Sequence, residues 1–159
     1  MKPIEHIILG IALLCLLVLY PSKSQSPMVY AEAENTHITA GNVVVDPAAS
    51  GGKYIYFSDF TTTLSRVPVR IPWYGNTYIW VHTRGIGSFA FYLKNHEQRI
   101  NENDIVRTVR EPWHWERVTT IKNTDPNAQF IIEYGMTTRN IGIDTFVFTN
   151  DPAAIPSMY

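Results

Sequence analysis

Short runs of alternating hydrophobic and polar residues recur along the chain from about residue 29 onward, with turn residues between them. Residues 66–71, RVPVRI, alternate strictly, which is the pattern of a strand with one buried face. Pro68 has no backbone N–H to donate, so it indicates an edge strand or a bulge. No helical periodicity appears after residue 25. The pattern therefore predicts an all-β domain.

The number of such runs suits two sheets packed face to face, since about nine strands are expected. Residues 95–112 are polar and read as a loop with at most a short strand near residues 105–106, and residues 151–159 read as an unpaired exit segment. The pattern shows no internal repeat and no second domain, so we expect a single β-sandwich. Its expected strands are 29–34, 43–45, 53–57, 66–71, 77–84, 88–94, 116–121, 129–134 and 143–149.

The first 24 residues differ in kind from the rest. Lys2 lies in a short polar head, and residues 7–20 form an uncharged apolar run. Pro21 then breaks the run, and small residues, Ser22 and Ser24, occupy the −3 and −1 positions of a cleavage site. This is the layout of a secretory signal peptide, and the run is shorter than the roughly 20 residues that span a bilayer. We expect cleavage after Ser24, secretion, and a mature domain of residues 25–159. The alternative is an uncleaved signal anchor.

Composition narrows the possible partners. The only cysteine, Cys15, lies in the expected signal peptide, so the mature domain would have no disulfide in an oxidising compartment, and a bound metal ion is one alternative staple. Without residues 1–24 the chain has 11 basic and 13 acidic residues and no basic stripe, which argues against nucleic acid as a partner. The 9 tyrosines, 7 phenylalanines and 4 tryptophans suit a sandwich core and stacking on sugars.

Two glutamates on the first expected strand share one face of the sheet. Glu32 and Glu34 are two residues apart, so their carboxylates repel each other unless water, an arginine or a cation intervenes. Asp144 starts the last expected strand, and the first and last strands of a sandwich are commonly neighbours. Three carboxylates and the carbonyls of residues 50–53 are oxygen ligands of the kind that Ca²⁺ takes. The alternative is that both glutamates simply face solvent.

Short motifs follow one another in a fixed order over residues 29–150. They are AEAE at 31–34, ASGGKY at 49–54, VRIP at 69–72, FY at 91–92, WHW at 113–115 and NIGIDTF at 140–146. This ordered series resembles carbohydrate-binding modules of the family 6 and family 35 type. The chain departs from that pattern at Asn95-His96, where the family has Asp-Gly.

The resemblance implies a galactose-binding-like jelly-roll sandwich with a structural Ca²⁺ ion. Glu32, Glu34 and Asp144 match the carboxylate ligands of the family's metal site. Lys53 ends the glycine-rich loop 50–53, whose backbone carbonyl oxygens could complete the site.

The resemblance also implies a sugar site in the loops at one end of the sandwich, away from the acidic residues. Trp113 would be the stacking platform and Asn140 a hydrogen-bond donor to sugar hydroxyls. An opposing aromatic ring would come from Tyr56 or Phe60, and Arg139 could pair with a uronate carboxylate. The alternatives are a core position for Trp113 and an ordinary solvated side chain for Arg139.

The sequence carries no convincing catalytic pattern. A glycosidase needs two carboxylates about 5–10 Å apart across a cleft; Glu32 and Glu34 meet that distance, but the resemblance assigns them to the metal. No nucleophile motif with serine or cysteine is present. We therefore expect a secreted, non-catalytic module that binds a polysaccharide or oligosaccharide and can accompany a carbohydrate-active enzyme. The alternative is a structural or adhesive sandwich that has lost the sugar site.

Overall fold

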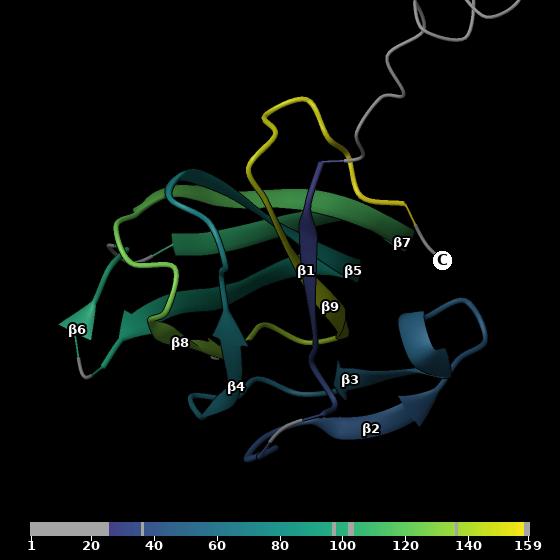
Figure 1. Ribbon diagram of the computed structural model, residues 1–159. Coiled ribbons are helices and arrows are strands. Elements are labelled where there is room, and N and C mark those ends of the chain that lie inside the picture. Colours follow the sequence, from purple (N-terminus) through teal and green to yellow (C-terminus); the bar gives the residue numbers. More distant parts are fainter. Residues whose placement is uncertain (1–25, 36, 97, 102–103, 136, 158–159) are drawn as a thin grey trace, which may run out of the picture.

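The structure, a computed structural model, describes residues 26–157 except 36, 97, 102–103 and 136. The expected signal peptide, residues 1–24, lies outside the described residues. Within the described part, no helix has the length and apolar character needed to cross a membrane. The described residues form nine strands and one 3₁₀ turn (Figure 1): β1 Met28–Glu32, β2 Asn42–Val45, η1 Ser50–Gly52, β3 Lys53–Phe57, β4 Leu64–Arg70, β5 Gly75–Asn95, β6 Gln98–Arg99, β7 Asp104–Asn123, β8 Gln129–Gly135 and β9 Ile141–Thr149.

Strands β5 and β7 run side by side across the whole molecule (Figure 1) and carry the sheet from one layer of the sandwich to the other. The first half of β5, up to Arg84, pairs with β9, whereas its second half, from Ala90 onward, pairs with β8. The two halves face each other, because the ring of Phe146 on β9 packs 5.5 Å from Phe91 on β5 and 5.3 Å from Tyr134 on β8. The predicted all-β sandwich is confirmed.

The prediction of a loop over residues 95–112 was wrong. Strand β7 begins at Asp104, and β5 is one strand where the sequence suggested two. The alternating pattern is weak here because the buried face of β7 includes Thr108, whereas Ile105 and Val109 on the other face are 57% and 67% exposed. The prediction for residue 68 was right, since β4 lies at the end of the strand order.

A bulge at the bend of β5 and β7 sets the position of Trp113. Thr83 pairs with His114 and Gly85 pairs with Arg110, so Arg84 alone faces three residues of β7. The middle one of these is Pro112, which cannot donate a ladder hydrogen bond and is therefore suited to a bulge. The tryptophan that follows this bulge contacts Tyr54 on β3 and Asp46 just after β2.

Strand β9 lies at the centre of the fold and is buried along its whole length. One edge pairs with β5. Along the other edge β3 pairs with residues 141–143 and β1 with residues 145–149, so Asp144 lies where one neighbour replaces the other. The backbone N–H of Ala33 donates to the carbonyl of Asp144 at 2.8 Å just beyond the end of β1. This change of neighbours brings the end of β1 and the turn η1 to one point of β9.

Candidate functional site

Three carboxylates meet at the point where β1 and β3 change places along β9. Glu32, Glu34 and Asp144 each offer one oxygen, and these oxygens all lie within 4.8 Å of one another. Glu32 ends β1 and Glu34 follows two residues later, so the spacing seen in the sequence directs both toward Asp144. The structure therefore brings together the three acidic residues that the sequence singled out.

The turn η1 holds the outer oxygens of two of these carboxylates. The Ser50 hydroxyl donates to Glu32 Oε1 at 2.7 Å, and the Ser50 backbone N–H donates to Asp144 Oδ2 at 2.8 Å. Gly51, with φ of +60°, lies next to Glu34 and gives the chain the left-handed turn that this loop requires. The loop 50–53 therefore does contact the acidic cluster, through Ser50.

The inner oxygens of the cluster have no partner. Glu32 Oε2, Glu34 Oε2 and Asp144 Oδ1 are all buried and form no hydrogen bond with any described residue. Buried polar atoms in folded proteins are nearly always paired, and buried anions need a compensating charge. Three converging carboxylate oxygens form the donor set that hard divalent cations prefer. The residues present can therefore hold a metal ion.

The electrostatics of the cluster agree with this interpretation. Burial and the charges of Glu32 and Asp144 together raise the pKa of Glu34 to about 7, against a backbone hydrogen bond to its own carboxylate and the Lys53 ammonium. Burial also raises the pKa of Glu32 above its ordinary value, against the hydrogen bond from Ser50. Without a cation the folded protein thus disfavours the full charge of the site. A divalent ion would relieve that cost.

His82 connects the acidic cluster to a group of aromatic rings. It lies in the middle of β5, is 3% exposed, and its Nδ1 lies 2.6 Å from Asp144 Oδ2. Its ring stacks on Trp113 with centroids 4.8 Å apart and an interplanar angle of 21°, and it lies 4.8 Å from the ring of Trp115. The acidic and aromatic sites are adjacent through this one side chain, whereas the sequence led us to expect them apart.

Trp113 is half-buried and held on several sides. His82 covers one face of its ring, and the Arg84 guanidinium lies 5.6 Å from the ring centroid. Its Nε1 donates to Asp46 Oδ2 at 3.0 Å, and Tyr54 packs edge-on with centroids 4.9 Å apart. These contacts from several segments fix the orientation of the ring.

Tyr56 and Asn140 form the polar side of the same corner. The Tyr56 hydroxyl donates to Asn140 Oδ1 at 2.9 Å, and the ring of Tyr56 lies 6.2 Å from that of Tyr54. Asn140 is exposed and has φ of +60°, a left-handed conformation that asparagine tolerates better than most residues. Gly85 allows this turn to lie against β5, because a Cβ at that position would clash with the Asn140 carbonyl oxygen.

The remaining predicted residues are less firmly placed in the cluster. Phe60 is 66% exposed in the loop after β3, and Arg139 is exposed next to Asn140. Neither makes a ring contact, ion pair or hydrogen bond with another described residue, so their roles stay predictions. Lys53 is exposed at the start of β3, with its ammonium close enough to Glu34 to affect its pKa.

Sequence reasoning missed four residues of this corner. His82 and Arg84 are two apart on β5, so their projection from one face was readable from the strand pattern. Asp46 ends β2 before a proline, and its Oδ2 also accepts from Arg84 Nη1 at 3.2 Å. Tyr54 lies within the matched motif 49–54. These four residues meet around Trp113 only because the fold brings distant segments of the chain together.

The hydrogen bonds of Asp46 account for its charge state. The bond from the Trp113 indole and the bond from the Ala48 backbone N–H lower its pKa, and the Arg84 guanidinium adds to the effect. Asp46 therefore stays ionised and keeps both the indole and the guanidinium in place.

No protein-family model and no curated protein matches the sequence. Solved structures do match the fold. A Podospora anserina β-(1,4)-mannanase with GH26 and CBM35 modules superposes with a TM-score of 0.66 at 14% identity, over 83% of this chain and 29% of that chain. This chain thus spans less than a third of the mannanase.

Two isolated modules match over almost their whole length. A family 35 carbohydrate-binding module from Clostridium thermocellum gives a TM-score of 0.59 at 10% identity, over 77% of this chain and 98% of that chain. A family 6 module of Cellvibrio mixtus lichenase 5A, in complex with cellotriose, gives 0.56 at 14% identity, over 77% and 97%. The chain has the β-sandwich fold of the family 6 and family 35 carbohydrate-binding modules, as its ordered motifs predict.

Proposed function

We propose that the chain is a secreted, non-catalytic carbohydrate-binding module with a structural Ca²⁺ ion. The observation that carries this proposal is the corner formed by Trp113, Tyr56 and Asn140, which come from three separate segments of a fold shared with carbohydrate-binding modules. A sugar site needs a fixed ring for the C–H face of the sugar and a few polar groups for its hydroxyls. This corner supplies both.

The contacts of each residue suggest its role in binding. His82 supports one face of the half-buried Trp113 ring, and the exposed part of that ring would be the stacking surface. Asn140 Oδ1 already accepts from Tyr56, which leaves the Asn140 amide N–H groups to donate to a sugar hydroxyl. Asp46 holds the indole N–H at the edge of the ring, and the Arg84 guanidinium lies over the ring. Because the polar groups are already oriented, little ordering is needed on binding.

Calcium would be held by Glu32, Glu34 and Asp144. When bound, the ion neutralises the converging charge and ties the end of β1 to β9. Ser50 orients two of the carboxylates and leaves their inner oxygens free for the ion. In this role the ion replaces the covalent staple that a secreted domain without disulfides lacks.

A second candidate function is that of a structural or adhesive sandwich. Trp113 favours it, because its indole N–H and one ring face are already occupied within the protein. Such a domain would keep the cation site and bind no glycan. The two candidates differ in one measurable property, which is calcium-supported glycan binding.

A glycan array probed with the full chain tests the proposal. We expect binding in Ca²⁺ that weakens in EDTA and weakens in Asn140→Ala. Asn76→Ala is the matched control, because Asn76 is an exposed asparagine at the far end of β5. Absence of binding to every glycan in the presence of Ca²⁺ would favour the structural candidate. Equal loss in both asparagine variants would remove the corner from the proposal. A single site binds modestly, so multivalent display is appropriate.

A further inference from the structure

A hollow of about 590 Å³ opens near the start of β5. The acidic and aromatic residues lie at the opposite end of the first half of this strand. Asn123, in its wall, pairs with Gly75, whereas the aromatic corner lies at Arg84. Nine residues of strand at about 3.3 Å each place the two ends about 30 Å apart. The volume lies within the range of about 300–1,000 Å³ that small-molecule sites occupy. The hollow is therefore separate from the site described above.

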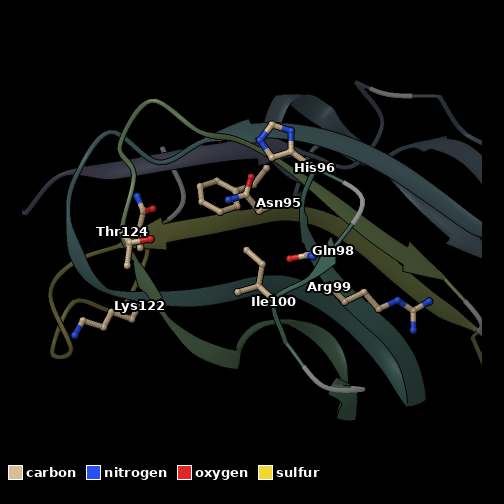
Figure 2. Close-up of a pocket in the computed structure, with 9 residues that line it drawn as sticks. Asn95, His96, Gln98, Arg99, Ile100, Lys122 and Thr124 are labelled. Carbon is tan, nitrogen blue, oxygen red and sulfur yellow. The ribbon is translucent and has the colours of Figure 1, made fainter.

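Uncharged polar groups face the centre of this hollow. In Figure 2 the Gln98 amide and the Thr124 hydroxyl point inward from opposite sides, with the Asn95 amide between them and Ile100 below. The charged ends of Lys122 and Arg99 extend away from the hollow (Figure 2). The interior therefore presents amide and hydroxyl groups beside an apolar side chain, with its two long cations outside.

One of these polar atoms lacks the partner that it needs. Asn95 Oδ1 is buried and forms no hydrogen bond with any described residue. Leaving a buried acceptor without a partner costs about 1–3 kcal/mol, so a hydrogen-bond donor that reaches this amide would stabilise it. By contrast Asn123 is fully used, because its Nδ2 donates to the carbonyls of Ile71 and Trp73 at 3.0 and 2.6 Å and its Oδ1 accepts from the Asp125 N–H at 3.1 Å.

The groups around the hollow are positioned by paired backbone. Asn95 on β5 lies directly opposite Gln98 on β6, and the Ile100 N–H donates to the Leu93 carbonyl at 2.8 Å. Asn95 is also opposite Phe130 near the start of β8, a buried residue that lines the hollow. Strand β5, which carries Asn95, is therefore held in register by two partner strands, β6 and β8.

We propose that this hollow is a second binding site, for an uncharged sugar residue. Amides and hydroxyls both donate and accept hydrogen bonds, as sugar hydroxyls do, and Ile100, which is 40% exposed, offers an apolar surface for sugar C–H groups. The choice of a sugar rests on the proposed function, whereas the presence of a site rests on the hollow itself. With two sites about 30 Å apart, one domain can bridge two glycan segments and gain avidity.

NMR titration of the ¹⁵N-labelled full chain tests this. The probes are cellotriose, mannotriose and laminaritriose, each raised to about 20 mM so that millimolar affinity is detected. We expect at least one to shift the side-chain amide signals of Asn95 and Gln98 and the backbone signal of Thr124. Gln98→Ala and Thr124→Val, both at exposed positions, should weaken that binding about three- to tenfold. Lys122→Gln should leave it unchanged, since its amine points away from the hollow.

The signals of Tyr56 and Asn140 report on the first site independently. Shifts at Asn95 and Gln98 that persist in Asn140→Ala would support the second site even if the first one fails. Shifts confined to Tyr56 and Asn140 for all three sugars would overturn the second site and leave the first. No shift at Asn95, Gln98 or Thr124 with any probe would overturn it as well.

Discussion

His82 Nδ1 lies 2.6 Å from Asp144 Oδ2, and both side chains are buried. Asp144 is part of the acidic cluster, and its other oxygen, Oδ1, has no partner among the described residues. On its other side the histidine ring stacks on Trp113. Asp144 orients His82, and His82 supports the Trp113 ring. A cation bound at Asp144 would therefore affect the position of Trp113 through this histidine.

Replacing His82 by alanine should lower the free energy of unfolding by about 2–4 kcal/mol. The change leaves a cavity between two tryptophans and removes a hydrogen-bond partner of Asp144. Urea unfolding measures this loss. The same change should also break the link between Ca²⁺ binding and tryptophan emission. Calorimetric titration with Ca²⁺ measures the binding, and fluorescence in the same titration measures the emission.

The control for this variant is His37→Ala, since His37 is exposed. We expect Ca²⁺ to change the emission of the wild-type chain and of the control, and to bind His82→Ala with a smaller change. An unchanged emission response in His82→Ala would show that the histidine does not link the two sites.

Replacing Glu34 by glutamine should have opposite effects with and without calcium. In EDTA at pH 7 the variant should melt at a higher temperature than the wild type, because a buried charge next to Glu32 and Asp144 is gone. In Ca²⁺ it should gain little, whereas the wild type gains about 2.7 kcal/mol when the ion is at 100 times its Kd. Thermal unfolding in the two buffers measures both effects. Glu111→Gln, at an exposed position, should behave as the wild type, and a lower melting temperature of Glu34→Gln in EDTA would contradict the repulsion.

The metal-free protein should lose stability as the pH rises. The pKa of Glu34 is raised from 4.5 to about 7 in the folded state, so between these values the folded chain binds more protons than the unfolded chain. The free energy of unfolding must then fall as the pH rises from about 4.5 to about 7. Urea unfolding in EDTA across this range measures the slope, which should be flatter in Glu34→Gln. A slope of the opposite sign would show that burial does not control this carboxyl group.

The sequence predicted the strands that carry a strong local pattern. Residues 53–57 and 129–134 match β3 and β8 closely, because apolar residues dominate them and turn residues flank them. It did not predict that β5 continues through its bend or that β7 begins at Asp104. Both features depend on pairing between β5 and β7 over their full length, which no single window of sequence contains.

The site was predictable only where residue type and spacing coincide. The two glutamates share a face because they are two apart, and Asp144 stood out as an acid at the start of an apolar strand. His82 had no such signal, since a lone histidine within a strand is equally compatible with solvent or core. Its role comes from Asp144, which is 62 residues away, and from a tryptophan placed by a bulge.

Replacing Gly85 by alanine should disturb the corner formed by Trp113, Tyr56 and Asn140 while leaving the acidic cluster intact. Gly85 has φ of +102°, and a Cβ there would meet the carbonyl oxygen of Asn140. The left-handed backbone and the overpacking together should cost about 2–4 kcal/mol, measured by urea unfolding. Gly75→Ala is the matched control, because its φ is +95° with nothing within 4 Å of the added atom, so it should cost about 1–2 kcal/mol. In NMR spectra only Gly85→Ala should shift the signals of Tyr56 and Asn140. Equal losses in the two variants would show that the Asn140 turn does not depend on close packing against β5.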